Sequence, residues 1–431
     1  MKILVRNVKL SEEYGFGENA VCVAIDGDTI SYVGLQAPEV AYDRVIDGKE
    51  NLLFPGFYNS HCHVAMSLFR GYGEGLPLDR WLNEKIFPAE DKLTERSVYF
   101  GTMLSIAEML RGGIVSFSDM YMFEDTVGRA ILETGIKANI SRSVVSFDEN
   151  ENPKNSFRFA ESVALARDFH LAGNGKIRVD FSVHAEYTNT ERMCRAVAEY
   201  AKEHGLGIQM HISETEKEHE ECKARRGGKT PIEFALSTGL LESPFCAAHC
   251  VWITPNDMDI MREKGAFASH NPISNLKLGS GVMPLPEMLS RGVSVALGTD
   301  GSASNNNLDM FKEMKTAAVL HKGVNRQPTV TDARTMCQLA TKGGAKAQGR
   351  HDCGRIEVGK KADLILVDLD SLHNIPSYGY ETTIAYSADA SDVKMTMVDC
   401  KILNENGEYT TIYVEKIKYD VKDFIKHNFE R

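Results

Sequence analysis

The sequence contains no apolar run long enough to span a membrane, and its start has too short an apolar run for a secretory signal peptide. It also lacks an excess of basic residues. The formal net charge is −11 at pH 7, which argues against nucleic acid or an anionic membrane as a partner. Nine cysteines, an odd number, are scattered without the spacing of a disulfide framework. These absences predict a cytoplasmic protein with reduced thiols.

The length of 431 residues fits one large barrel-type domain plus a smaller one. Hydrophobic residues make up 43% of the chain and charged residues 25%, values typical of soluble globular proteins. No internal repeat or low-complexity segment is present.

Both ends of the chain have the alternating pattern of β-strands. The predicted strands are 2–9, 20–25 and 29–34 near the start, and 362–368, 393–403 and 410–414 near the end, followed by a short amphipathic helix over 421–429. These segments predict a small β-sandwich domain built from both termini, residues 1–54 plus 352–431.

The middle of the chain, residues 55–351, alternates short apolar β-runs with amphipathic helices. The predicted strands are 177–183, 207–212, 245–248, 266–269 and 293–298, and the predicted helices are 92–111, 190–204, 307–322 and 331–343. Repeated β-then-α units of this length indicate a parallel sheet with helical crossovers. Their number predicts an α/β fold, an eight-stranded (β/α) barrel of the TIM type.

His61 and His63 stand on either side of Cys62, on a predicted strand that follows the turn at Pro55-Gly56. Side chains alternate along a strand, so the two imidazoles face one side and Cys62 the other. Two neutral imidazoles at this spacing can hold one metal ion. Alone, such a pair is a weak indication, because most His-x-His pairs are surface or core residues.

Later strand ends strengthen this indication. The carboxyl ends of all barrel strands meet at one face, where active sites form. The residues at these ends are His61, His63, His184, His211 with Glu214 three positions on, His249, His270 and Asp300. Among them, three histidines and one carboxylate fit a catalytic zinc site with an open position, namely His61, His63, His211 and Asp300.

Three other features admit a plainer interpretation. His270, within Ser269-His270-Asn271-Pro272, can simply shape a loop. The turn-rich segment 302–306 can be a helix cap rather than a substrate contact. Cys246 and Cys250 flank His249 and suggest a zinc finger, but no second pair follows at finger spacing, so buried strand thiols are favoured.

Several motifs resemble the amidohydrolase superfamily. They are the Pro-Gly-Phe lead into His61-Cys62-His63, His211-Ile212-Ser213-Glu214, His249, the stretch 269–279 and Gly298-Thr299-Asp300-Gly301. Within the superfamily they are similar to the deaminase/chlorohydrolase branch, and most similar to the 5-methylthioadenosine/S-adenosylhomocysteine deaminases. The resemblance covers nearly the whole chain, including the closing segment 354–364.

The resemblance implies one divalent ion, zinc with iron(II) as the alternative, held by His61, His63, His211 and Asp300. Two-metal members use a carbamylated lysine on the fourth barrel strand, and the segment 177–184 contains no lysine. The ion activates a water molecule, and Asp300 takes a proton from it. Glu214, one helical turn from His211, is the implied proton shuttle, and His249 polarises the developing oxyanion.

The resemblance also implies substrate contacts. Glu90 matches the family's ligand of the ribose hydroxyls, although a helix-start carboxylate is the simpler interpretation. Arg142 and Arg158 match arginines that suit the carboxylate of a homocysteine tail. His184 matches a purine contact. Glu186 adds a negative charge near the rim of the site, which argues against an anionic tail.

The predicted activity is therefore hydrolytic deamination of an adenosine-type nucleoside, giving the inosine analogue and ammonia. The alternative is deamination or dechlorination of another ring: guanine, a cytosine-like base, a pterin or a triazine. A non-catalytic relative would usually lack a metal ligand, and here all four ligands and Glu214 are present. The family resemblance further implies a homo-oligomer, a dimer or tetramer.

Overall fold

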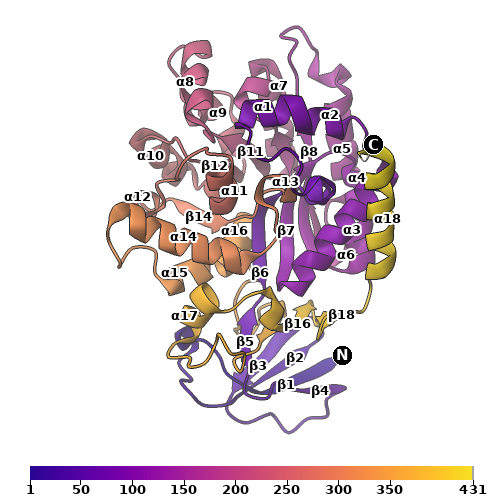
Figure 1. The fold of residues 1–431 in the computed structure, drawn as a ribbon, viewed down its shortest axis with the longest axis vertical. Helices are drawn as coiled ribbons and strands as arrows, with labels where there is room; N and C mark the ends of the chain where they lie inside the picture. Colours follow the sequence, from indigo (N-terminus) through magenta and orange to yellow (C-terminus); the bar gives the residue numbers. More distant parts are fainter. Residues whose placement is uncertain (430–431) are drawn as a thin grey trace.

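The computed structural model describes residues 1–429, and eight parallel strands form a nearly closed barrel in it (Figure 1). Each strand pairs in parallel with the next in chain order. At the closing edge, the N–H of Asp300 donates to the carbonyl of His61 at 2.9 Å. The strands are β6 (Phe57–Cys62), β7 (Ile114–Tyr121), β8 (Lys137–Val144), β10 (Phe181–Val183), β11 (Ile208–Ile212), β12 (Phe245–His249), β13 (Phe267–His270) and β14 (Ser294–Leu297). The predicted barrel is confirmed.

Three barrel strands depart from the sequence prediction. The predicted strand 177–183 is two strands, β9 (Ile177–Val179) and β10, separated at Asp180. Strands β7 and β8 lie outside the predicted set because both carry polar residues at buried positions. Partners far along the chain satisfy these groups: Ser116 Oγ on β7, for example, donates to Gln348 Oε1 at 2.5 Å.

Helices surround the barrel, and side-chain caps fix several of their starts. Thr94 caps the helix predicted from residue 92, and Asp309 caps the one predicted from residue 307. Helices of six or more residues include α3 (Glu95–Arg111), α4 (Glu124–Thr134), α5 (Phe157–Phe169), α7 (Glu191–His204), α8 (Glu216–Arg225), α9 (Pro231–Ser237), α10 (Pro255–Lys264), α12 (Leu285–Ser290), α14 (Met310–Asn325) and α15 (Ala333–Gln338). Short helices are α1 (Leu78–Trp81), α2 (Phe87–Glu90), α6 (Ala172–Gly175), α11 (Pro272–Lys277), α13 (Ser302–Asn305), α16 (Gly344–Ala347) and α17 (Tyr380–Thr382). The predicted helix 331–343 is α15 followed by a π-helical turn, Leu339–Gly343.

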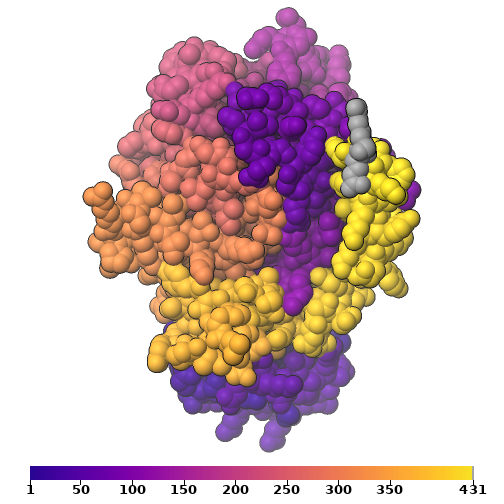
Figure 2. Space-filling view, viewed as in Figure 1, coloured from indigo at the N-terminus to yellow at the C-terminus, as the bar shows by residue number. Residues whose placement is uncertain are grey.

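Two further sheets are built from the chain ends. One has the order β3-β2-β1-β4 and the other β18-β17-β16-β15-β5. Their strands are β1 (Lys2–Val8), β2 (Val21–Asp26), β3 (Thr29–Gly34), β4 (Arg44–Asp47), β5 (Leu52–Pro55), β15 (Leu364–Val367), β16 (Val393–Val398), β17 (Lys401–Glu405) and β18 (Glu408–Tyr409). A second hydrophobic core, separate from that of the barrel, includes Ile3, Val23, Leu53, Leu364 and Met397. In Figure 2 the indigo start of the chain lies against the orange-yellow segment below the barrel.

The C-terminal elements differ from the prediction. The predicted strand 393–403 turns back at Asp399 and Cys400, whose φ angles are 46° and 66°, so β16 and β17 form a hairpin. The predicted strand 410–414 is not a strand. The last helix, α18 (Val414–Asn428), starts seven residues before the predicted 421 and packs along α3 (Figure 1). Among residues 1–429, no helix is long and apolar enough to cross a bilayer.

The separate core supports a division into two domains, and we propose the predicted boundaries, 55–351 for the barrel and 1–54 plus 352–431 for the smaller unit. A buried ionic cluster joins the two. Lys137 Nζ at the start of β8 lies 2.6 Å from Asp363 and 2.6 Å from Asp399. The hydroxyl of Tyr58 on β6 also donates to Asp363, at 2.5 Å. Both carboxylates belong to the C-terminal segment, so this cluster ties that segment to the bottom of the barrel.

Replacing Lys137 should therefore destabilise the protein. Lys137→Met leaves Asp363 without its ion-pair partner and, among the described residues, Asp399 with Lys176 alone, at 2.7 Å. Breaking a buried pair costs about 3–5 kcal/mol of unfolding free energy. The matched control is Lys223→Met, which removes an exposed pair with Glu220 and should cost less than about 1 kcal/mol. Denaturant unfolding measures both, and equal midpoints for the two variants would contradict the assignment.

Candidate metal centre and substrate cavity

The predicted metal-binding and acid–base residues lie at or just after the carboxyl ends of the barrel strands. His61 is on β6 and His63 directly follows that strand, while His211 is on β11 and His249 ends β12. Asp300 follows β14 with a left-handed φ of 59°, and His249 has a φ of 76°. Such backbone angles are costly outside glycine and persist only where surrounding contacts enforce them. They turn both side chains toward the mouth of the barrel.

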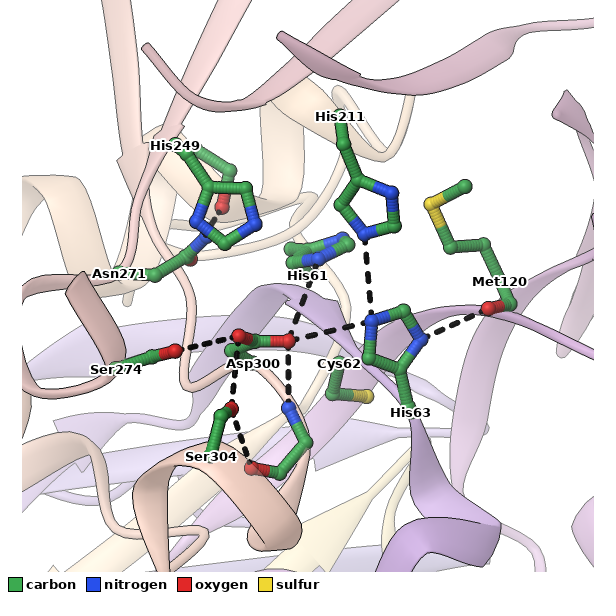
Figure 3. Close-up of polar contacts among 12 residues, drawn as sticks. His61, Cys62, His63, Met120, His211, His249, Asn271, Ser274, Asp300 and Ser304 are labelled. Carbon is green, nitrogen blue, oxygen red and sulfur yellow. Dashed lines mark hydrogen bonds and ion pairs between the residues drawn. The ribbon is translucent and has the colours of Figure 1, made fainter. Parts of the chain in front are cut away.

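Three histidines and one carboxylate lie close together at the mouth of the barrel (Figure 3). The ligand atoms of His61, His63 and His211 form one convergent group, and those of His61, His249 and Asp300 form a second that overlaps it. His63 Nε2 lies 3.4 Å from His211 Nε2 and 3.2 Å from Asp300 Oδ1. His61 Nε2 lies 3.6 Å from the same carboxylate oxygen. Ligand atoms about 2.0–2.1 Å from a tetrahedral zinc ion are separated by roughly 3.3 Å. The spacing of these donors therefore fits a single divalent ion.

The orientation of the imidazoles supports the same assignment. His63 Nδ1 lies 2.8 Å from the carbonyl oxygen of Met120, and His211 Nδ1 lies 2.8 Å from that of His184. A carbonyl only accepts, so each Nδ1 carries a proton, and in the neutral imidazole each Nε2 presents a lone pair to the centre. His61 Nε2 is buried without a hydrogen-bond partner in the described chain. A cation satisfies all three lone pairs.

Asp300 is held by groups around it. Its Oδ2 accepts hydrogen bonds from Ser274 at 2.6 Å and Ser304 at 2.9 Å, and its Oδ1 accepts from the N–H of Gly301 at 2.7 Å. The two hydroxyls fix one oxygen, and this leaves Oδ1 directed at His61 and His63 (Figure 3).

Burial and charge set the protonation of the donors. Burial lowers the pKa of His61 and of His211 well below the usual range. Burial also acts to lower the pKa of His63, but the Asp300 carboxylate outweighs it and raises that pKa to about 8. Without an ion, His63 is therefore protonated and pairs with Asp300 at neutral pH.

Glu214 and His249 lie beside the metal centre. Glu214 Oε2 is 3.8 Å from His249 Nε2, and Glu214 Oε1 accepts from Ser280 at 3.3 Å. His249 Nδ1 contacts Asn275 Oδ1 at 2.8 Å. Burial raises the pKa of Glu214. The predicted helical turn between His211 and Glu214 is wrong: β11 ends at Ile212, and Ser213 adopts a left-handed φ of 48°.

A cavity of about 460 Å³ opens over the metal centre. Its lining contains every predicted site residue except His61, which lies beneath His63 and Asp300. The predicted lining residues are His63, Glu90, Arg142, Arg158, His184, His211, Glu214, His249 and Asp300. The structure thus brings together the residues predicted for metal, proton transfer and substrate.

The outer part of the cavity contains two arginines, of which one has an ion-pair partner among the described residues and the other has none. Arg142 Nε is paired with Glu161 at 2.7 Å, and its Nη1 donates to the carbonyl of Ser143 at 2.7 Å. Arg158 stacks over Phe157 at 4.5 Å and has no ion pair with the described residues. Glu90 accepts a hydrogen bond from the hydroxyl of Tyr121 at 2.6 Å.

Tyr121 is a cavity residue that the sequence did not reveal. It is the last residue of β7, so recognising β7 as a strand would have placed it at a strand end. Trp81, Phe87 and Tyr187 also line the cavity, and no local pattern marks them. Ser304, from the turn-rich segment 302–306, lines the cavity and contacts Asp300.

The structure corrects the interpretation of Glu186. Its side chain is buried and lies outside the cavity lining. Arg225 at 2.6 Å and Arg226 at 2.5 Å neutralise it. It therefore supplies no free negative charge at the rim, and the argument against an anionic substrate tail falls.

The remaining histidine and cysteine features are structural. His270 is buried against His321, with 3.0 Å between the Nε2 atoms, and does not line the cavity. Cys62 points away from the metal centre and donates to the carbonyl of Ser118 at 3.3 Å. Cys246 and Cys250 have no metal-binding partners among the described residues.

The barrel and the donor set together define the class: a barrel protein with a three-histidine, one-carboxylate centre under a substrate-sized cavity. The sequence model of the amidohydrolase family matches residues 52–403 of this chain. The chain belongs to the amidohydrolase family.

Individual relatives narrow the comparison. A 5-methylthioadenosine/S-adenosylhomocysteine deaminase from Dictyoglomus thermophilum is 43% identical over 424 residues, 98% of each chain. A 5'-deoxyadenosine deaminase from Methanosarcina mazei is 41% identical over 395 residues, 92% of this chain and 90% of the relative. The structure of an adenosine deaminase from Xanthomonas campestris with bound zinc superposes with a TM-score of 0.92 at 30% identity, covering 99% and 98% of the two chains. The predicted family resemblance is confirmed.

Metal content tests the donor set directly. We expect one divalent ion per purified wild-type chain and far less than one in His61→Ala, because a ligand is lost. His204→Ala changes an exposed histidine far from the centre and should keep the full complement.

The affinity of the protein for the divalent ion should fall roughly tenfold per pH unit below about 8, since the ion must displace the His63 proton. Elemental analysis and metal titration measure both effects, and a full complement in His61→Ala would contradict the assignment.

Proposed function

We propose that the protein is a metal-dependent hydrolytic deaminase of adenosine-type nucleosides, namely 5'-methylthioadenosine, S-adenosylhomocysteine and adenosine. The observation that carries the proposal is the placement of Glu214 and His249 beside four convergent metal donors, at the floor of one cavity. Relatives at 41–43% identity that are named for such nucleosides support the substrate class.

We further propose zinc as the ion, with iron(II) as the alternative, held by His61, His63, His211 and Asp300. Three imidazoles and one carboxylate are ligands that zinc accepts readily, and a zinc-bound relative supports the choice. When bound, the ion supplies Lewis-acid activation of water.

Glu214 is the proposed proton shuttle. Burial raises the pKa of Glu214, so its carboxyl group holds a proton to higher pH than an exposed glutamate does. It can deliver that proton to a purine ring nitrogen. Hydrolytic attack at the amino-bearing carbon requires that ring nitrogen to gain a proton, and departure of ammonia requires another at the exocyclic nitrogen. A carboxyl group that releases and regains protons meets both needs.

His249 is proposed to stabilise the oxygen that attacks the ring. Asn275 Oδ1 accepts from Nδ1, so the ring is held with Nε2 facing Glu214 and the cavity. In its protonated form, Nε2 donates to a developing oxyanion at that position. Asp300 is proposed both to hold the ion and to take a proton from the attacking water.

Glu90 is the proposed ligand of the ribose hydroxyls. Burial raises its pKa to about 7, against the opposing effect of the Tyr121 hydroxyl. Two adjacent ribose hydroxyls donating to this carboxylate would restore the hydrogen bonds that burial removes. His184 is proposed to contact the purine, since it lines the cavity next to the metal centre and its carbonyl orients His211.

We propose that Arg142 and Arg158 differ in how they meet the 5'-substituent of the substrate. Arg142 already holds Glu161 and a backbone carbonyl, so its position is fixed and its charge largely balanced. Arg158, without an ion pair among the described residues, is the group available to a carboxylate on the substrate. We also propose a cytoplasmic location, which nine unpaired cysteines support, and a homo-oligomeric assembly.

Removal of the Glu214 carboxylate should abolish most activity without removing the metal. Glu214→Gln is expected to lower kcat by about 10²–10⁴-fold, the usual contribution of a general acid–base group. Glu216→Gln, an exposed residue at the start of α8, is the matched control and should be unaffected. Ammonia release from 5'-methylthioadenosine measures the rates. A kcat for Glu214→Gln close to that of wild type would refute the role.

Arg158 should matter only when the 5'-substituent is charged. In Arg158→Ala, kcat/KM for S-adenosylhomocysteine should fall about 10–100-fold, the value of one charged hydrogen bond, while 5'-methylthioadenosine is turned over as before. Arg167→Ala alters an exposed arginine on the same helix and serves as control. Equal losses on both substrates would show that Arg158 does not recognise the tail.

A further inference from the structure

The proposed proton shuttle sits on a strained turn. Ser213, which precedes Glu214, has a φ of 48°, a left-handed angle that serine adopts only under restraint. The carboxyl group of Glu214 has two polar contacts with described residues: 3.3 Å to Ser280 Oγ and 3.8 Å to His249 Nε2. The position of its carboxyl group therefore depends on the backbone that carries it.

One buried side chain holds that backbone. The carboxylate of Glu218 accepts the N–H of Ser213 at 2.9 Å with Oε1 and the N–H of Glu214 at 2.8 Å with Oε2. Glu218 is 6% exposed and belongs to the first turn of α8. Its backbone N–H donates to the capping hydroxyl of Thr215 at 3.1 Å. Both of its oxygens are thus committed to the turn, and its own placement is fixed by the helix.

Other contacts do not replace it. The carbonyl of Ser213 accepts from the N–H groups of Val251 and Trp252, and Ser213 Oγ contacts His219 Nδ1 at 3.2 Å. These restrain Ser213, but Glu218 is the described partner of the Glu214 amide. Glu218 does not line the cavity, so it cannot touch a substrate bound there.

We infer that Glu218 is a positioning residue, which holds the turn that aims Glu214 at the substrate. This inference rests on the proposed role of Glu214. It assigns Glu218 a function through hydrogen bonding to the backbone rather than through contact with substrate or metal. Small displacements of an acid–base group have large effects, because proton transfer requires the donor and acceptor to be within hydrogen-bond reach.

Two substitutions separate hydrogen bonding from charge. E218Q keeps the length of the side chain, but its amide nitrogen can only donate, so one backbone N–H loses its acceptor. E218D keeps the charge but is one methylene shorter and cannot reach both N–H groups. The matched control is E233Q. Glu233 occupies the same position in the first turn of α9 and also accepts a backbone N–H, that of Thr230 at 2.9 Å, outside the cavity.

In ammonia-release assays of the metal-loaded proteins, E218Q and E218D should both lower kcat by on the order of 10²-fold, with KM changed less than roughly threefold and metal content unchanged. E233Q should retain wild-type kcat. Full activity in E218D together with loss in E218Q would assign the effect to charge and overturn the inference. Wild-type kcat in both variants would overturn it as well.

Amide hydrogen exchange provides a readout that does not need activity. In the peptide that spans residues 212–215, exchange should be at least roughly tenfold faster in E218Q than in wild type, and unchanged in E233Q. If wild type deaminates no nucleoside, the proposed function fails while faster exchange still shows that Glu218 restrains the turn. Unchanged exchange in both Glu218 variants would overturn the restraint itself.

Discussion

The constraint on which this site depends is the burial of three imidazoles beside one carboxylate. His61 and His63 present Nε2 atoms 3.6 and 3.2 Å from Asp300 Oδ1, and His211 Nε2 lies 3.4 Å from His63 Nε2. The Nε2 atom of His61 is buried without a hydrogen-bond partner in the described chain. Such a group of acceptors is unfavourable without a cation, since each lone pair would otherwise lose its hydrogen bond on burial. The barrel supplies the rigid rim on which this arrangement can be maintained.

Backbone strain, together with the contacts that hold it, fixes the positions of the side chains at the strand ends. Asp300, His249 and Ser213 all have left-handed backbones at strand ends. Each is accompanied by polar groups that hold it: two serine hydroxyls on Asp300, Asn275 on His249 and the Glu218 carboxylate at the turn after β11. In a regular strand, the side chains at these turns would stay within the barrel wall. The strained backbone directs them toward the cavity instead.

In the outer half of the cavity, the deciding property is which charged side chains are neutralised by ion pairs. Arg142 is neutralised by Glu161, whereas Arg158 is not paired with a described residue. Glu186, which the sequence places near the rim, is buried under Arg225 and Arg226. The local charge that a substrate tail meets is therefore set by pairings between distant segments rather than by the composition of the loop.

The sequence by itself predicted the barrel, the strand ends that carry histidines or Asp300, and the four proposed metal donors. Period-two alternation places His61 and His63 on one face, and parallel topology brings His211 and Asp300 to the same rim. It did not reveal β7 and β8, the hairpin at Asp399 and Cys400, or the early start of α18, because each depends on partners remote in the chain. Only the tertiary structure decided which imidazole nitrogen faces the centre, through the carbonyls of Met120 and His184. Contacts between residues 27 to 57 positions apart fix that choice, and no local periodicity encodes them.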